Sequence, residues 1–198
     1  AAQYLTALYQ LAKAAVEKED YAEAKELLLR AVGEYPHNLG EGKLESGQEN
    51  NLYYLLGLVQ EKLGEAKDAF ESLTRACCGE SEPVGMMYYN DQPPEMIYYQ
   101  GLAYRMLGEE EQAVRRFQKL VDYGREHIRD DVKIDYFAVS LPDLLIFEEN
   151  LNERNRKHCL FMMSLGLKGL GRIDEAEKCA EELLAMDNAH QEIRVHDL

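Results

Sequence analysis

The sequence predicts an all-α protein, a solenoid of antiparallel helix pairs with insertions between the pairs. The main observation is one pattern of bulky, small and apolar residues that recurs four times along the 198 residues. A second observation is that glycine recurs where three of the four pairs would turn, at Gly64, Gly108 and Gly171. Glycine adopts a positive φ at low cost, so these positions suit the end of one helix and the start of the next.

The first predicted repeat covers about residues 5–38. Ala12 and Ala24 fall where its two helices would approach each other most closely. Pro36 is predicted to end the second helix, because proline cannot continue the hydrogen-bond ladder. The insertion that follows, at about 39–49, is polar and rich in glycine, which predicts a surface loop.

The second and third predicted repeats cover about 50–79 and 94–127, with an insertion at about 80–93 between them. The small residue of the first helix is Gly57 in one repeat and Gly101 in the other. We expect both glycines to lie where the paired helices touch, since a side chain there would hold the helices apart.

The fourth predicted repeat covers about 157–190, after an insertion at about 128–156 that is as long as another helix pair. Residues 132–136 alternate apolar and polar side chains, which leaves a short strand open as an alternative. The longer stretch 130–139 also fits a period of about 3.6 residues, so helix is favoured there.

These four in-register matches resemble the tetratricopeptide repeat, a helix–turn–helix unit of about 34 residues. The resemblance implies a single array over residues 1–198 whose role is to bind and organise other proteins. We expect no cofactor.

Two stretches are similar to a narrower family. Tyr88 to Gly108 and Lys133 to Cys159 resemble the C-terminal repeat region of uncharacterised bacterial proteins. In that family a β-sandwich related to galactose mutarotase precedes the repeats. The resemblance implies a larger bacterial parent protein with a carbohydrate-associated front half, and it supplies no catalytic residue for this chain.

The composition argues against two classes of partner. A formal net charge of −15 disfavours nucleic acids and anionic membranes, because both are bound by basic surfaces. No run approaches the roughly 18 apolar residues that cross a bilayer. The four cysteines lack CxxC spacing and are predicted to be free thiols, which favours a reducing cytoplasm.

The sequence carries no motif that predicts catalysis or a metal site, so we expect a protein that is not an enzyme. The five histidines are scattered, without HExxH or His-x-His spacing. His158 and Cys159 are adjacent, so on a helix their side chains diverge by about 100° and do not form a nucleophile pair. As zinc ligands they would need a second pair, which the sequence does not show.

The predicted binding surface is the concave face, which the first helix of each pair lines in such arrays. The residues predicted to lie there form an aromatic and aliphatic set, the concave stripe: Tyr9, Tyr54, Leu58, Tyr98, Tyr99, Leu102, Phe161 and Leu165. An apolar patch of this kind indicates a protein or peptide partner, including the parent's own N-terminal domain. The alternative is that the insertions fold back and cover the stripe. Arrays that clamp a peptide carboxylate need Lys and Asn here, so such a clamp is not expected.

A second candidate surface is the loop that carries Tyr88, Tyr89, Asn90 and Asp91. Its aromatic, amide and carboxylate groups suit saccharides as well as peptides. This favours an alternative function, an accessory domain of a carbohydrate-active protein. In the plainer interpretation, Tyr88 and Tyr89 fill a gap beneath the insertion. A homodimer formed through exposed helices is a further hypothesis.

Overall fold

The fold is built from helix pairs, as the computed structural model shows for residues 2–33, 48–85, 92–133 and 150–196. Every regular element in these described ranges is an α-helix, so the predicted fold class is confirmed. The four pairs and one terminal helix are α1 (Ala2–Glu17) with α2 (Tyr21–Val32), α3 (Asn50–Lys62) with α4 (Ala66–Ala76), α5 (Pro94–Met106) with α6 (Glu110–His127), α7 (Leu151–Gly169) with α8 (Ile173–Met186), and α9 (Gln191–Val195).

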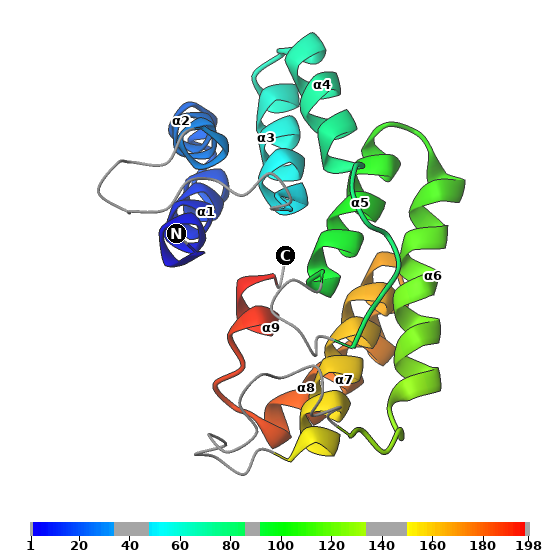
Figure 1. Cartoon of the computed structure of the whole chain (residues 1–198). Coiled ribbons are helices and arrows are strands. Elements are labelled where there is room, and N and C mark those ends of the chain that lie inside the picture. Colours follow the sequence, from blue (N-terminus) through cyan, green and yellow to red (C-terminus); the bar gives the residue numbers. More distant parts are fainter. Residues whose placement is uncertain (1, 34–47, 86–91, 134–149, 197–198) are drawn as a thin grey trace, which may run out of the picture.

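The pairs follow one another around an arc, from α1 and α2 in blue to α7 and α8 in yellow and orange (Figure 1). The short helix α9 lies on the inner side of this arc. One core cluster of buried apolar side chains runs through the array, from Leu8 on α1 to Ile193 on α9. The inner side of the arc, where α9 lies, is therefore part of the core.

Each pair turns through the same backbone conformation. Gly64, Gly108 and Gly171 have φ angles of 78°, 83° and 75°, as the sequence predicts for these turns. In the first pair Glu19 takes this place with a φ of 59°, a conformation that costs a non-glycine residue about 1–2 kcal/mol. The next residue closes the turn in every pair; the amide of Glu65, for example, donates to the carbonyl of Gln60 at 2.9 Å. This pattern is a Schellman motif, which satisfies the last carbonyls of a helix.

The small residues lie at helix contacts. A Cβ atom on Gly57 would lie 2.7 Å from Cγ of Leu73, and one on Gly101 would lie 2.4 Å from Cε1 of Phe117. A Cβ atom on Gly169, which approaches the same ring from α7, would lie 2.2 Å from Cδ1. Phe117 is therefore enclosed by glycines from two neighbouring pairs and is fully buried. Burial of such a side chain contributes about 2–3 kcal/mol.

The last pair begins earlier than the sequence pattern placed it. α7 starts at Leu151 rather than near 157, because Asn150 caps it by accepting the backbone amides of Asn152 and Glu153. Much of the three predicted insertions lies outside the described residues. Residues 130–133 of the stretch 130–139 are neither helix nor strand, so the favoured helix is wrong there, and the rest of that stretch lies outside the described residues. None of the helices in the described ranges combines the length and the apolar character that a membrane span needs.

Candidate protein-binding surface

The members of the concave stripe come from the first helix of each pair. Solvent still reaches Tyr54, Leu58 and Leu102, which are half-buried. The others are buried in the core: Tyr9, Tyr98, Tyr99, Phe161 and Leu165. The structure therefore places five of the eight side chains in the core, and it leaves the three half-buried ones, on α3 and α5, partly accessible.

The stripe is held together by tyrosines from different pairs. The hydroxyl oxygens of Tyr9 and Tyr99 lie 2.6 Å apart and both are buried. The ring of Tyr99 also lies 5.6 Å from that of Tyr54 and 5.5 Å from that of Tyr98, measured between centroids. Loss of water around the ionised form raises the pKa of Tyr9 and of Tyr99 above the usual value. Both hydroxyls therefore stay protonated at neutral pH.

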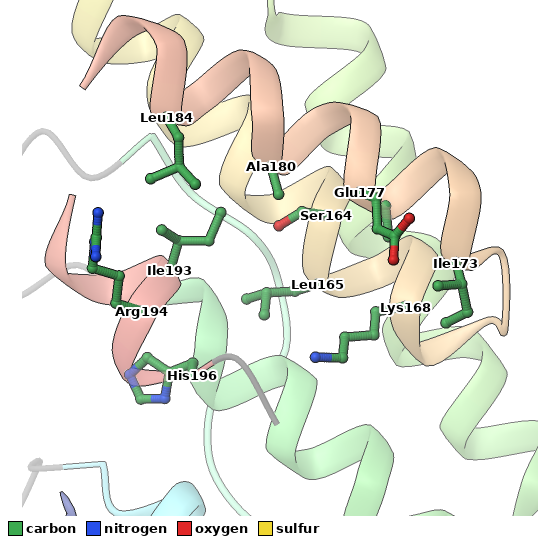
Figure 2. A pocket seen from close by; sticks show the side chains of 11 residues that line it. Ser164, Leu165, Lys168, Ile173, Glu177, Ala180, Leu184, Ile193, Arg194 and His196 are labelled. Carbon is green, nitrogen blue, oxygen red and sulfur yellow. The ribbon is translucent and has the colours of Figure 1, made fainter. Parts of the chain in front are cut away.

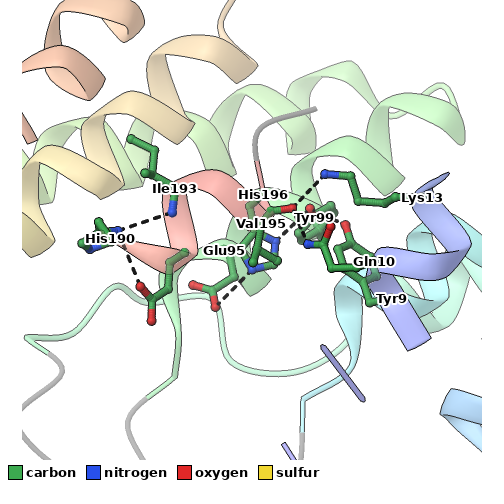
Figure 3. A network of polar contacts seen from close by, with 10 residues as sticks. Tyr9, Gln10, Lys13, Glu95, Tyr99, His190, Ile193, Val195 and His196 are labelled. Carbon is green, nitrogen blue, oxygen red and sulfur yellow. Dashed lines mark hydrogen bonds and ion pairs between the residues drawn. The ribbon is translucent and has the colours of Figure 1, made fainter. Parts of the chain in front are cut away.

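Residues 190–196, the C-terminal segment, cover much of this surface. The imidazole of His196 lies 5.9 Å from the ring of Tyr9 and 5.6 Å from that of Tyr99, and its Nδ1 is 3.0 Å from the Tyr99 hydroxyl. At the other end, the ring of His190 lies 5.5 Å from that of Phe161. The segment therefore contacts the stripe through both of its terminal residues. Figure 3 shows the contact at His196, beside Tyr9 and Tyr99.

The backbone of the segment is held as well. Lys13 on α1 donates from Nζ to the carbonyl oxygen of Val195 at 2.8 Å, and Gln10 donates to the same oxygen at 3.5 Å. Val195 is the last residue of α9, so its carbonyl lacks a partner within the helix. A lysine at this end also complements the helix dipole.

A buried carboxyl lies beneath the segment. Oε1 of Glu95, near the start of α5, is 3.8 Å from Nε2 of His196. The distance alone indicates an ion pair, but burial raises the pKa of Glu95 to about 7 and lowers the pKa of His196 to about 4. Both shifts have loss of water as their first cause, and both favour the uncharged form. We therefore describe the pair as two largely neutral groups in the slightly acidic range.

Cavities adjoin the segment on several sides. One of about 240 Å³ lies between α7, α8 and α9, with an apolar wall (Figure 2). That wall includes Leu165, Ala176, Ala180, Leu184 and Ile193. Another, of about 200 Å³, lies on the other side of His196, against α1, α3 and α5. The C-terminal segment thus leaves part of the inner surface unfilled.

Family models described as tetratricopeptide repeat match residues 9–83 and 95–123. The chain contains tetratricopeptide repeats. The matches cover most of α1 to α4 and of α5 and α6. Repeats of this family generally mediate protein–protein interaction.

The chain is also similar to a solved structure described as the crystal structure of MamA. The two share 19% sequence identity over 95% of this chain and 81% of that chain, with a TM-score of 0.33. A likeness at that score carries no information on function.

The described residues show no arrangement typical of a metal site, and two buried thiols are disfavoured as nucleophiles. In the described ranges, no group of three or more His, Cys, Asp and Glu side chains could hold a metal ion. His158 is bound to the carbonyl of Val84 at 2.8 Å. Burial raises the pKa of Cys159 and of Cys77 to about 12, which disfavours the thiolate that nucleophilic chemistry needs.

The second candidate surface, the loop at 88–91, falls in a part of the chain that the structure does not describe. Tyr88, Tyr89, Asn90 and Asp91 lie outside the described residues. The described residue that follows them, Gln92, is buried and accepts a hydrogen bond from Gln48 at 3.0 Å.

Sequence reasoning missed α9 and the role of His196. The last predicted repeat ended near 190, and His196 was counted only among scattered histidines. A signal was present: Ile193 and Val195 follow the last repeat, and a solenoid needs an element that covers its terminal repeat.

Proposed function

We propose that this chain is a non-catalytic scaffold that binds a protein segment on its concave stripe. The observation that supports this most strongly is that a protein segment already lies there, namely residues 190–196 of the same chain. The surface therefore accommodates both a backbone carbonyl, at Lys13, and apolar or aromatic side chains.

The chemistry of the stripe favours an apolar partner. Tyrosine and leucine side chains form it, and they contribute to binding through buried area and ring contacts. The partner is a helical or extended protein segment, either of another protein or of a domain that precedes these repeats in the same polypeptide. We also propose the cytoplasm as its location, on the basis of the free cysteines. The saccharide-binding alternative rests on the loop outside the described residues, so no structural observation favours it.

Selection from a random peptide library on the full chain tests this function. Selected peptides are then titrated against wild type and against Leu58→Gln and Leu102→Gln, which alter half-buried members of the stripe. Phe70→Gln is the matched control, because Phe70 is 62% exposed on α4, the second helix of its pair. Circular dichroism checks that each variant is folded.

We expect the stripe variants to weaken peptide binding about tenfold and the control to leave it unchanged. Equal binding by all four proteins would contradict the proposal, as would a library that yields no binder.

A further inference from the structure

The C-terminal segment makes specific contacts with the repeats, but its own helix contributes little stability. Its helix, α9, has five residues, which is too short to be stable in isolation. Only Ile193 and His196 are buried in it, whereas Gln191, Glu192 and Arg194 are exposed. Its place on the inner surface therefore depends on these two side chains, on the contacts of Val195 with α1 and on the ring contact of His190 with Phe161.

Those two side chains contact different elements. Ile193 lies on α9, and His196 is the residue directly after this helix. Ile193 faces the apolar wall formed by α7 and α8, and His196 lies among the tyrosines of α1 and α5 (Figures 2 and 3). The segment thus presents an aliphatic side chain and a ring to two different parts of the concave side.

The C-terminal segment does not fill the space that surrounds it on the inner side of the arc. Beyond the two cavities beside His196, a third of about 330 Å³ lies at its other end, beside His190 and Glu192. The apolar wall continues past Ile193 along α8, where Ala176 and Ala180 line the cavity and Ile173 is 46% exposed. A longer helix would cover area that α9 leaves open.

We propose that residues 190–196 are a displaceable latch, and that the partner is a longer amphipathic protein helix which takes their place. This rests on the proposed function, and it names the partner's chemistry: aliphatic side chains for the α7 and α8 wall, and an aromatic or imidazole ring for the site between Tyr9 and Tyr99. The latch is joined to α8 by a short connection, residues 187–189. Its effective concentration at the stripe is therefore high, and a partner binds only by displacing it.

Full-length chain and a fluorescent peptide of residues 187–196 test the latch. Ile193→Asp and His196→Ala each remove one anchor, and Gln191→Ala is the matched control at an exposed position of the same helix. We expect wild type and the control to bind the peptide weakly, because their own latch competes. Both anchor variants bind it about tenfold more tightly or better. Adding Lys13→Ala to His196→Ala removes most of this gain, because Lys13 donates to the carbonyl oxygen of Val195.

Equal affinity of wild type and the anchor variants would overturn the latch. So would a wild-type dimer in light scattering that Ile193→Asp converts to a monomer, since the segment would then be exchanged between two copies. If Ile193→Asp is unfolded by circular dichroism, His196→Ala decides the question, because it removes only a ring.

The library peptides separate this proposal from the function on which it rests. Peptides that bind wild type and His196→Ala equally would leave the scaffold function intact and overturn the latch. Absence of peptide binding by both forms would overturn both.

Discussion

The hydroxyl oxygens of Tyr9 and Tyr99 lie 2.6 Å apart, although 90 residues separate them in the sequence. They join α1 directly to α5 across the inner side of the arc, past the α3 and α4 pair. His196 binds the same Tyr99 hydroxyl at 3.0 Å. The Tyr99 hydroxyl therefore takes part both in the contact between α1 and α5 and in the docking of the C-terminal segment.

Tyr99→Phe is expected to destabilise the protein more than Tyr9→Phe. Removal of the Tyr99 hydroxyl leaves both the Tyr9 hydroxyl and the His196 ring without this partner, and an unsatisfied buried polar group costs about 1–3 kcal/mol. Removal of the Tyr9 hydroxyl breaks one bond and costs about 1 kcal/mol. Urea unfolding of both variants measures the difference, and an equal or reversed order would contradict the shared role of Tyr99.

Glu95→Gln is expected to gain stability relative to wild type as the pH rises. Because burial raises the pKa of Glu95 from 4.5 to about 7, its protonated form stabilises the fold. That contribution is complete below pH 4.5 and is lost as the pH rises through about 7. The neutral amide has no such dependence. The free energy of unfolding of the variant minus that of wild type is therefore expected to rise by on the order of 2–3 kcal/mol from acid to mildly alkaline pH.

This effect is measured as the difference in free energy of unfolding between the two proteins from acid to mildly alkaline pH. The difference is needed because His196 has the opposite dependence. Its lowered pKa means that its contribution is complete above pH 6.5 and is lost as the pH falls through about 4. A difference between the two proteins that does not change with pH would show that Glu95 is not the group that titrates.

Glu19→Gly is expected to stabilise the first turn. Glu19 is exposed and has a φ of 59°, whereas the three equivalent turns have glycine. Relief of the left-handed conformation contributes about 1 kcal/mol, reduced by the entropy that glycine adds to the unfolded chain. Thermal unfolding gives the result, with Gly64→Ala as the reverse substitution. The two changes should shift the melting temperature in opposite directions.

Gly101→Ala is expected to be destabilising by roughly 1–3 kcal/mol through overpacking. The added methyl carbon would lie 2.4 Å from Cε1 of Phe117, a fully buried ring that Gly169 also approaches closely, along the same Cδ1–Cε1 edge. In the background of Phe117→Leu, where the ring is gone, the same substitution should cost less. Equal costs in the two backgrounds, measured by a double-mutant cycle, would exclude the ring as the cause.

The sequence predicted those features of the fold that depend on local spacing. Gly57 and Gly101 could be placed at helix contacts, and Gly64 at a turn, because each lies within one helix–turn–helix unit. The docking of His196 could not be predicted in this way. Its partner Tyr9 lies 187 residues earlier in the chain, and helical periodicity carries no information about such distant contacts.

The candidate site also has a part that the sequence predicts and a part that it does not. Periodicity identified the side chains of the concave stripe, because each repeats a position of its own helix. Whether they are open depends on what the chain places over them, and here that is the C-terminal segment on Tyr9, Tyr99 and Phe161.

The most direct test of a concave stripe that exchanges its own C-terminal segment for a partner is hydrogen exchange on the unmodified full-length chain. Exchange is followed at the amides of residues 191–196, with and without a saturating library-selected peptide that binds the stripe. We predict that the peptide accelerates exchange at Ile193, Val195 and His196, because it displaces them into solvent. Bound peptide with unchanged protection of these amides would contradict the claim.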